Sequence, residues 1–276
     1  MPWSEPSVER GRRRHRLGRV SKTALVIESD PTDDACRLGD WLTGAGLALD
    51  VRRAHAGDPL PEELDEHAAV VVLGGEQHVY PGPDGRPGAP WFPATESLLR
   101  KAVRHKVPTL GICLGGQLLA QAHGGTVEAS PSGPEIGTGL VARRDAAERD
   151  VLWSGVPFVP DVLQWHFDEI TELPLGATLL ATSSRYANQA FRVGDRAWGT
   201  QFHIECDTAQ YAAWVDGNRA DLADRGIDAD FLIARVDGLL DDLFEVWQPF
   251  ARRFADLALG RLESPAGTRP SLPLLG

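Results

Sequence analysis

Cysteine is scarce in this sequence of 276 residues, and long apolar runs are absent from it. The three cysteines, Cys36, Cys113 and Cys206, are too few and odd in number for a disulfide framework, so we expect a reduced setting in which one thiol can be reactive. No run of 18 apolar residues is present, which excludes a transmembrane helix. The basic N-terminus also lacks the apolar stretch of a signal peptide. We therefore predict a cytoplasmic protein without a membrane partner.

Positive charge is in deficit, because 28 Lys and Arg stand against 39 Asp and Glu, a formal net charge of −11. Such a chain repels phosphate backbones, so we expect no nucleic-acid partner. Cofactor motifs are missing as well. There is no Walker A or G-x-G-x-x-G motif for a nucleotide, and no C-x-x-C pair to complete a zinc site with His203 and Glu205. The sequence therefore predicts no metal and no cofactor.

Composition divides the chain into three parts. Residues 1–21 are rich in arginine and lack an apolar pattern, so we predict a flexible basic tail. Residues 22–206 alternate strand-like and helical runs, which is typical of an α/β domain with an open, mostly parallel sheet and helices on both faces. The predicted strands are 23–28, 47–51, 68–75, 108–113, 139–142, 178–181, 189–193 and 197–202, and the predicted helices are 33–43, 93–106 and 114–122.

Residues 207–276 are predicted to form a helical extension and a tail. Apolar residues recur there at steps of three and four, at Leu232, Val236, Leu239, Leu243, Trp247, Phe250, Phe254 and Leu257. This stripe favours packing on the α/β part over a dimer or partner surface. Pro249 is predicted to divide the helix, because an interior proline costs a helix about 3 kcal/mol.

The most informative segment is the turn around Cys113. An apolar strand ends at this residue and an apolar helix starts directly after it, with Gly111 and Gly115 two residues to either side. This G-x-C-x-G spacing is the thiol version of a nucleophile elbow, whose strained turn lifts the side chain to the edge of the sheet. The start of a helix favours a thiolate and offers free N–H groups to an oxyanion. A buried cysteine in a tight turn is the alternative, and the glycines favour the nucleophile.

A reactive thiol needs a base, and the base must be held by a third group. An apolar strand is predicted to end at His203, and Glu205 follows two residues later. Side chains two residues apart on an extended segment point the same way, so the carboxylate can fix the tautomer of the imidazole. A histidine on an edge strand beside a solvated glutamate is the alternative, which the elbow at Cys113 makes the weaker one.

The two motifs together resemble the paired signatures of the class I glutamine amidotransferase family. The resemblance covers about residues 22–206 and implies a flavodoxin-like open α/β sheet. It also implies that Cys113 is the nucleophile, His203 the base and Glu205 the residue that orients the base. Ile204 stands where the family usually has proline, and isoleucine still permits the extended geometry between His203 and Glu205.

The same resemblance assigns an oxyanion hole and substrate contacts. Gly74 and Gly75 match the glycine pair of the family, with one N–H of the oxyanion hole from Gly75 and the other from Leu114. One such donor is typically worth about 10²–10³ in rate. Gln117 matches the position that contacts bound glutamine, and Gly74 is assigned to the substrate site as well.

A further segment looks most like the free-standing relatives of the amidotransferase domain of GMP synthase. It contains Trp165, His166 and Asp168 in a Trp-His-x-Asp pattern and continues to Leu173 and Pro174. This resemblance makes His166 and Phe167 candidates to line the substrate pocket. A structural histidine packed beside Trp165 is the alternative for His166.

The resemblance implies an enzyme that hydrolyses the side-chain amide of glutamine through a γ-glutamyl thioester. Ammonia would pass to an acceptor or to a synthase partner, because the sequence has no ATP motif and no room for an ATP-using domain. A γ-glutamyl peptidase with the same triad is a second interpretation, in which no partner is needed. A catalytically silent regulatory subunit is a third, and the presence of all three triad residues opposes it.

Overall fold

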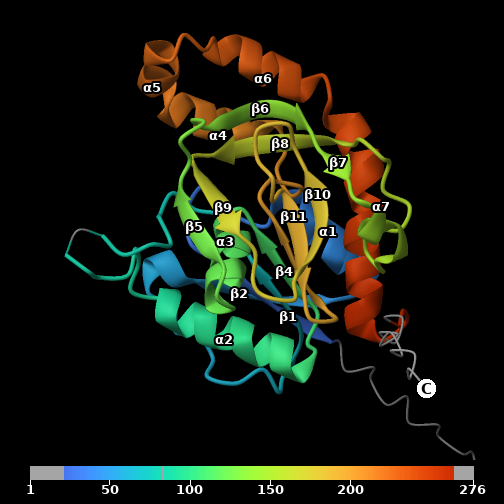
Figure 1. Ribbon diagram of the computed structural model, residues 1–276. Helices are drawn as coiled ribbons and strands as arrows, with labels where there is room; N and C mark the ends of the chain where they lie inside the picture. The colour runs from blue at the N-terminus through green and yellow to red at the C-terminus, as the bar shows by residue number, and fades with distance from the viewer. Residues whose placement is uncertain (1–21, 83, 264–276) are drawn as a thin grey trace, which may run out of the picture.

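An eight-stranded, mostly parallel sheet forms the centre of the protein in the computed structural model, which describes residues 22–82 and 84–263 (Figure 1). The strand order is β2-β1-β3-β4-β12-β11-β10-β7. The first five of these strands run parallel, and β11, β10 and β7 are antiparallel to their neighbours. The predicted fold class is confirmed. The strands of this sheet are β1 (Thr23–Glu28), β2 (Ala48–Arg53), β3 (His67–Val72), β4 (Thr109–Ile112), β7 (Ala142–Arg143), β10 (Thr178–Thr182), β11 (Ala190–Val193) and β12 (Ala197–Thr200).

Alternate residues of the buried strands face two separate cores. In β1, Ala24 and Val26 pack in a cluster that also contains the buried faces of α1 (Cys36–Ala45) and α7 (Leu240–Leu259). Leu25 and Ile27 pack in a second cluster with α2 (Phe92–His105) and α3 (Leu114–Ala122). Helices therefore cover both faces of the sheet, and this explains why its parallel strands are apolar without alternation.

Two antiparallel strand pairs stand outside the main sheet. β5 (Thr126–Ala129) pairs with β9 (Asp168–Glu172), and β6 (Glu135–Leu140) pairs with β8 (Asp161–His166). The segment after β12 is tied to β8, because the His203 N–H donates to the Leu163 carbonyl oxygen at 2.9 Å. The ends of β12 and β8 are thereby held side by side. Short 3₁₀ turns at Ala54–Ala56 and Asp145–Arg149 complete the α/β part.

The chain ends in four helices, α4 (Thr208–Gly217), α5 (Arg219–Asp224), α6 (Ala229–Asp237) and α7. Figure 1 shows α4, α5 and α6 grouped beside β6 and β8, whereas α7 runs along the side of the sheet. The apolar stripe of α7 is buried against the α/β part, as the sequence predicts. Its side chains that are at most 3% exposed include Leu243, Trp247, Phe250 and Phe254. None of the described helices is both long and apolar enough to cross a membrane.

Pro249 does not divide the last helix, and that prediction was wrong. α7 is continuous over its 20 residues with the proline inside it. The apolar stripe instead breaks between α6 and α7, at Gly238. Burial of large aromatic side chains on both sides of Pro249 outweighs the missing hydrogen bond. The basic tail predicted for 1–21 and the end of the chain from 264 lie outside the described residues.

Candidate active site

Cys113 occupies a strained turn between β4 and α3. Its backbone has φ 50° and ψ −109°, a region that residues other than glycine rarely enter. The flanking glycines make this turn possible, because a Cβ on Gly115 would overlap the Val72 carbonyl oxygen and one on Gly111 would overlap the Gly115 carbonyl oxygen. The predicted elbow is therefore present, and the strain is stored at the proposed nucleophile.

Two free backbone N–H groups flank this turn. Neither the N–H of Gly75 nor that of Leu114 has a hydrogen-bond acceptor among the described residues. The two residues are neighbours in space, because a Cβ on Gly75 would lie 2.9 Å from Leu114 Cδ2. This is the arrangement that an oxyanion hole requires. The role assigned to these two groups stays a prediction.

His203 and Glu205 form a buried hydrogen-bonded pair. The distance from His203 Nδ1 to Glu205 Oε1 is 2.6 Å, and both side chains are almost fully buried. Glu205 Oε2 accepts a second hydrogen bond from the Ile204 N–H at 2.9 Å, which fixes the carboxylate. β12 ends at Thr200, so His203 lies on the segment after the strand and not at its tip. Isoleucine at position 204 is compatible with this pairing, as the sequence suggested.

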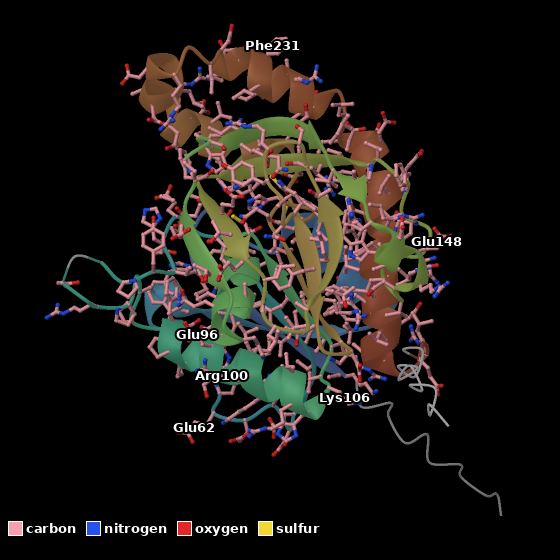
Figure 2. The ribbon with its side chains drawn as sticks, in the orientation of Figure 1. Glu62, Glu96, Arg100, Lys106, Glu148 and Phe231 are labelled. Carbon is pink, nitrogen blue, oxygen red and sulfur yellow. The ribbon has the colours of Figure 1, made fainter. Side chains whose placement is uncertain are left out.

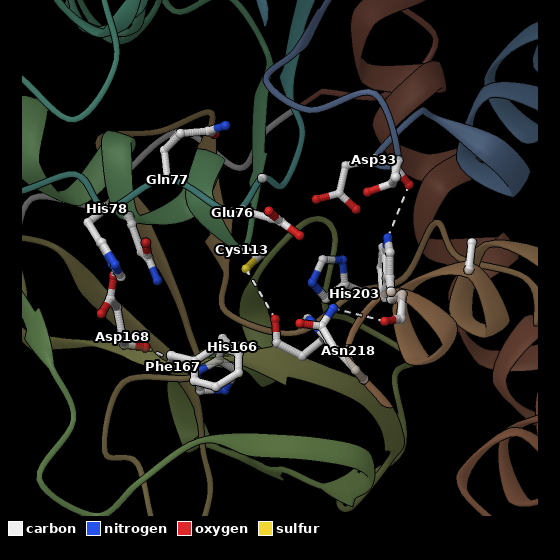
Figure 3. A pocket seen from close by; sticks show the side chains of 17 residues that line it. Asp33, Glu76, Gln77, His78, Cys113, His166, Phe167, Asp168, His203 and Asn218 are labelled. Carbon is white, nitrogen blue, oxygen red and sulfur yellow. Dashed lines mark hydrogen bonds and ion pairs between the residues drawn. The ribbon is translucent and has the colours of Figure 1, made fainter. Parts of the chain in front are cut away.

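The other ring nitrogen of His203 points toward the thiol. Nε2 is buried and has no hydrogen-bond partner among the described residues. Burial opposes a charged imidazole, but the carboxylate of Glu205 and the sulfur of Cys113 outweigh it, and they raise the pKa of His203 well above its usual 6.5. Figure 3 shows Cys113 and His203 facing the same space. The raised pKa therefore favours an imidazolium ring beside the sulfur of Cys113.

A cavity of about 410 Å³ opens on Cys113 and His203. Among the residues that the structure describes, no lysine or arginine lines it, whereas three carboxylates do. The lining residues come from both parts of the chain: Thr32, Asp33, Gly75, Glu76, Gln77, His78, Cys113, Gln117, Trp165, His166, Phe167, Asp168, His203, Ala213, Trp214, Gly217 and Asn218. Trp214 of α4 packs on the His203 ring, with ring centroids 4.7 Å apart.

On one side of Cys113 the cavity is lined by Phe167, Asp168 and His78 (Figure 3), and Gln117 is a fourth lining residue. Asp168 is fixed by two donors, His78 Nδ1 at 2.6 Å and the Tyr80 hydroxyl at 3.1 Å. Burial and the neighbouring carboxylate raise the pKa of Tyr80 to about 12, so the hydroxyl stays a donor. We name this side the acyl arm, defined by these four lining residues.

Gln117 and His166 are held differently from each other. Gln117 Nε2 donates to Gln201 Oε1 at 3.3 Å, and Gln201 Nε2 in turn lies 3.7 Å from Cys113 Sγ. Both nitrogens of His166 are engaged within the protein, with the Asp168 carbonyl oxygen at 3.0 Å and Glu135 Oε2 at 3.1 Å. His166 thus lines the cavity with its hydrogen-bonding atoms already used, and its contact with substrate stays a prediction.

On the His203 side of Cys113 the cavity is lined by Asp33, Glu76 and Asn218 (Figure 3) and by Trp214, which packs on the His203 ring; we name these four residues the exit arm. Asp33 is 7% exposed, and its Oδ1 atom has no hydrogen-bond partner among the described residues. Burial raises the pKa of Asp33 to about 7, although the neighbouring His203 acts in the opposite direction. Gly74 is required beside it, since a Cβ there would lie 2.7 Å from Asp33 Oδ2.

Sequence reasoning missed the residues of the exit arm and part of the acyl arm. Asp33 and Trp214 belong to no motif, and their positions follow from the packing of α4 against the loop after β1, where Trp214 Nε1 donates to the Thr32 carbonyl oxygen at 3.1 Å. Asp168 lies inside the Trp-His-x-Asp segment, and this motif was the one sequence feature that could have identified it. No group of three or more potential metal ligands is present in 22–82 and 84–263.

The sequence and the fold both resemble those of known proteins. The family model of glutamine amidotransferase class-I matches residues 44–213. A glutamine amidotransferase-like protein of Salmonella typhimurium is 31% identical over 186 residues, which cover 67% of this chain and 76% of that protein. A glutamine-hydrolysing GMP synthase of Porphyromonas gingivalis is 31% identical over 188 residues, which cover 67% of this chain but only 34% of the synthase.

Two further matches bear on the chemistry and the fold. Gamma-glutamyl peptidase 4 of Arabidopsis thaliana is 28% identical over 149 residues, which cover 53% of this chain and 57% of the peptidase. A crystal structure of a glutamine amidotransferase from Thermotoga maritima superposes with a TM-score of 0.76 at 28% identity and covers 86% of this chain and 99% of its own. The likeness to the solved structure thus extends beyond the matched family segment.

Proposed function

This chain belongs to the class I glutamine amidotransferase family, and we propose that it hydrolyses a γ-glutamyl amide with a Cys113–His203–Glu205 triad. The observation that carries the proposal is how the two ring nitrogens of His203 are hydrogen-bonded. One of its nitrogens is bonded to Glu205, and the other is free beside a thiol held in a strained turn. That is the arrangement a thiol nucleophile needs, with a base and a group that orients the base.

In the acylation step, Cys113 Sγ forms a bond to the amide carbon of the substrate. The negative charge moves to the carbonyl oxygen, which accepts hydrogen bonds from the N–H groups of Gly75 and Leu114. The carbon–nitrogen bond then breaks as His203 Nε2 gives its proton to the leaving amine. The products of this step are a γ-glutamyl thioester on Cys113 and a free amine, which is ammonia when glutamine is the substrate.

In the deacylation step, water takes the place of the amine. His203 accepts a proton from the water, whose oxygen forms a bond to the thioester carbon. The carbon–sulfur bond breaks, glutamate leaves, and the proton returns from His203 to the thiolate or stays on the imidazole. Glu205 holds the ring and stabilises its positive charge in both steps, which is why its burial with His203 matters.

The acyl arm fits the amino-acid end of glutamine. The carboxylate of Asp168, fixed by His78 and Tyr80, offers a place for the α-ammonium group. Gln117 lines the same cavity, and we assign to it the contact with bound glutamine that the family resemblance implies. We assign Phe167 to the apolar wall of this arm, and His166 to the support of the segment through Glu135.

We propose that the reaction takes place in the cytoplasm, and that residues 22–206 form the catalytic domain. The 207–276 extension contributes α4, whose Trp214 closes the cavity over His203. For glutamine as substrate, ammonia passes to an acceptor or to a synthase partner. The GMP synthase relative supports this arrangement, since two thirds of its length lies outside the matched region.

A γ-glutamyl peptidase-like hydrolase is the second candidate, and one observation favours it. The cavity of about 410 Å³ lies within the range of pockets that hold drug-sized ligands, about 300–1,000 Å³, so it offers room for a γ-glutamyl compound larger than glutamine. Its exit arm continues past His203, where a larger leaving amine can lie. The Arabidopsis peptidase relative supports the same interpretation. A silent regulatory subunit is the third interpretation, and the hydrogen bond between His203 and Glu205 argues against it.

The test is product release by purified protein. We expect glutamate to be released from glutamine, from a γ-glutamyl dipeptide or from both, and Cys113→Ala to abolish it. Cys36→Ala is the matched control, because Cys36 is a second free thiol that does not line the cavity, and this variant keeps its activity. Release of glutamate by Cys113→Ala at the wild-type rate would refute the proposal.

A further inference from the structure

The exit arm lies where the leaving amine must be. In the proposed chemistry the amine receives its proton from His203 Nε2, so it departs on the His203 side of the reacting carbon. Asp33 borders that side, because its Oδ2 and His203 Cε1 are both within 3.1 Å of the place a Cβ on Gly74 would occupy. Trp214 forms the opposite wall by packing on the His203 ring.

Two carboxylates face each other in this arm. Figure 3 shows the side chains of Asp33 and Glu76 turned toward one another above Cys113 and His203. Glu76 is exposed at the mouth, whereas Asp33 is buried with Oδ1 lacking any partner among the described residues. A buried polar atom without a partner is rare in folded proteins, and here it borders an open cavity. The Asp33 side chain is among those that line the cavity, so its carboxylate lies next to any ligand bound there.

Positive charge is missing around Asp33. The titratable groups that face it are His203, Glu205, Asp30 and Glu76, and only the histidine can be cationic. Among the described residues the cavity lining has no lysine or arginine, and its other two histidines, His78 and His166, are already paired with Asp168 and Glu135. A cation that enters the arm supplies the missing countercharge, whereas a carboxylate is repelled.

We propose that Asp33 and Glu76 bind a positively charged group on the leaving amine, so that γ-glutamyl amides of cationic amines, such as diamines, are a preferred substrate class. This inference rests on the thiol chemistry of the proposed function. It narrows that function, because a γ-glutamyl dipeptide places a carboxylate in the exit arm. The bonds made and broken are those of the acylation and deacylation steps. The products are glutamate and the free diamine.

The burial of Asp33 also predicts how the preference for a cationic amine depends on pH. Its raised pKa of about 7 means that much of it is protonated in neutral solution, and a bound cation favours the ionised form. Preference for a cationic amine should therefore increase as the pH rises through about 7. The preference of a variant without this carboxyl should respond less to pH.

The experiment compares three γ-glutamyl amides whose amines share one carbon chain and end in an ammonium, a methyl or a carboxylate group. We expect kcat/KM for the ammonium compound to exceed that for the methyl compound by about tenfold or more, and the carboxylate compound to be poorest. Asp33→Asn should lower the ammonium-to-methyl ratio by about tenfold. Glu76→Gln should lower it by a smaller factor, and as an exposed position it serves as the test if Asp33→Asn does not fold.

Glu62→Gln is the matched control for net charge. Glu62 is exposed, does not line the cavity, and lies beside α2 in Figure 2, so the ratio should stay unchanged. Equal kcat/KM for the ammonium and methyl compounds, a preference for the carboxylate compound, or a ratio unaffected by both pocket variants would overturn the inference while leaving the thiol chemistry intact. Absence of hydrolysis for all three compounds and for glutamine would overturn the proposed function, and the inference with it.

Discussion

Replacing Asp33 by asparagine should stabilise the protein, and more so at high pH. Asparagine keeps the shape of the side chain but cannot ionise. The wild-type carboxyl is 7% exposed and lacks a partner on Oδ1, so its charged form is poorly solvated. A carboxyl with a raised pKa holds its proton more tightly in the folded state than in the unfolded state. Its contribution to stability is therefore lost as the pH rises from about 4 to about 7.

The magnitude follows from the pKa itself. The rise from 3.8 to about 7, at about 1.4 kcal/mol for each pH unit, corresponds to about 4 kcal/mol when Asp33 is fully ionised. Between pH 5 and pH 8.5 the free-energy cost of ionising Asp33 in the folded protein increases by about 3 kcal/mol. The rest of the cost is already present at pH 5, where Asp33 is mostly ionised in the unfolded chain. The stability gained by Asp33→Asn should thus grow by about 3 kcal/mol over this range.

Urea unfolding of both proteins at pH 5 and pH 8.5 measures this difference, with the free energy of unfolding taken from linear extrapolation. His203 and Glu205 are present in both proteins, so to first order their titration cancels in the comparison. A gap that is the same at both pH values, or that shrinks at pH 8.5, would refute the reasoning. A growing gap would show that the fold tolerates an unfavourable charge in the cavity, as expected of a residue kept for function.

Three other substitutions and one control substitution test the site and the fold. Glu205→Gln should lower kcat by about 10³–10⁴-fold in a glutamate-release assay, because the imidazole loses the group that fixes its tautomer, and a loss under tenfold would contradict this. Gly115→Ala should lower the free energy of unfolding, measured in urea, by about 3 kcal/mol or more, since the added Cβ overlaps the Val72 carbonyl oxygen. Gly44→Ala, whose Cβ would have nothing within 4 Å, should instead stabilise helix α1 by about 0.5–1 kcal/mol. Pro249→Ala should raise the free energy of unfolding by about 1–3 kcal/mol, because it restores a backbone hydrogen-bond donor inside α7. The gain should appear as a higher thermal midpoint. A lower midpoint would mean that proline fits its surroundings better than alanine.

The features that could be predicted from the sequence are those that depend on residues close together along the chain. The elbow at Cys113 could be found because a strained turn needs glycines at fixed distances along the chain. The pair His203 and Glu205 could be found because two residues of an extended segment share a side, and their hydrogen bond of 2.6 Å agrees with that expectation. The buried strand β1 was recognisable because both of its faces are covered.

Residues brought in by tertiary packing gave no such signal. Asp33 lies in the loop after β1 and is near His203 only because β1 and β12 deliver their ends to the same edge of the sheet. Trp214 is one aromatic residue of an ordinary helix, and its place over His203 depends on how α4 returns to the cavity. Pro249 misled the prediction because propensity acts on a helix in isolation, whereas α7 is held by the aromatic side chains that it buries.

Mass spectrometry of the protein after treatment with a chloroketone analogue of glutamine tests the central claim most directly. The reagent presents a γ-glutamyl-like group to the nucleophile and remains bound to it. We predict one adduct per chain, located on the peptide that contains Cys113, and none on Cys36 or Cys206, the other free thiols of the described chain. Excess glutamine should slow its formation, and Cys113→Ser should abolish it. An unmodified Cys113, or labelling of all three thiols at similar rates, would contradict a nucleophile at the elbow.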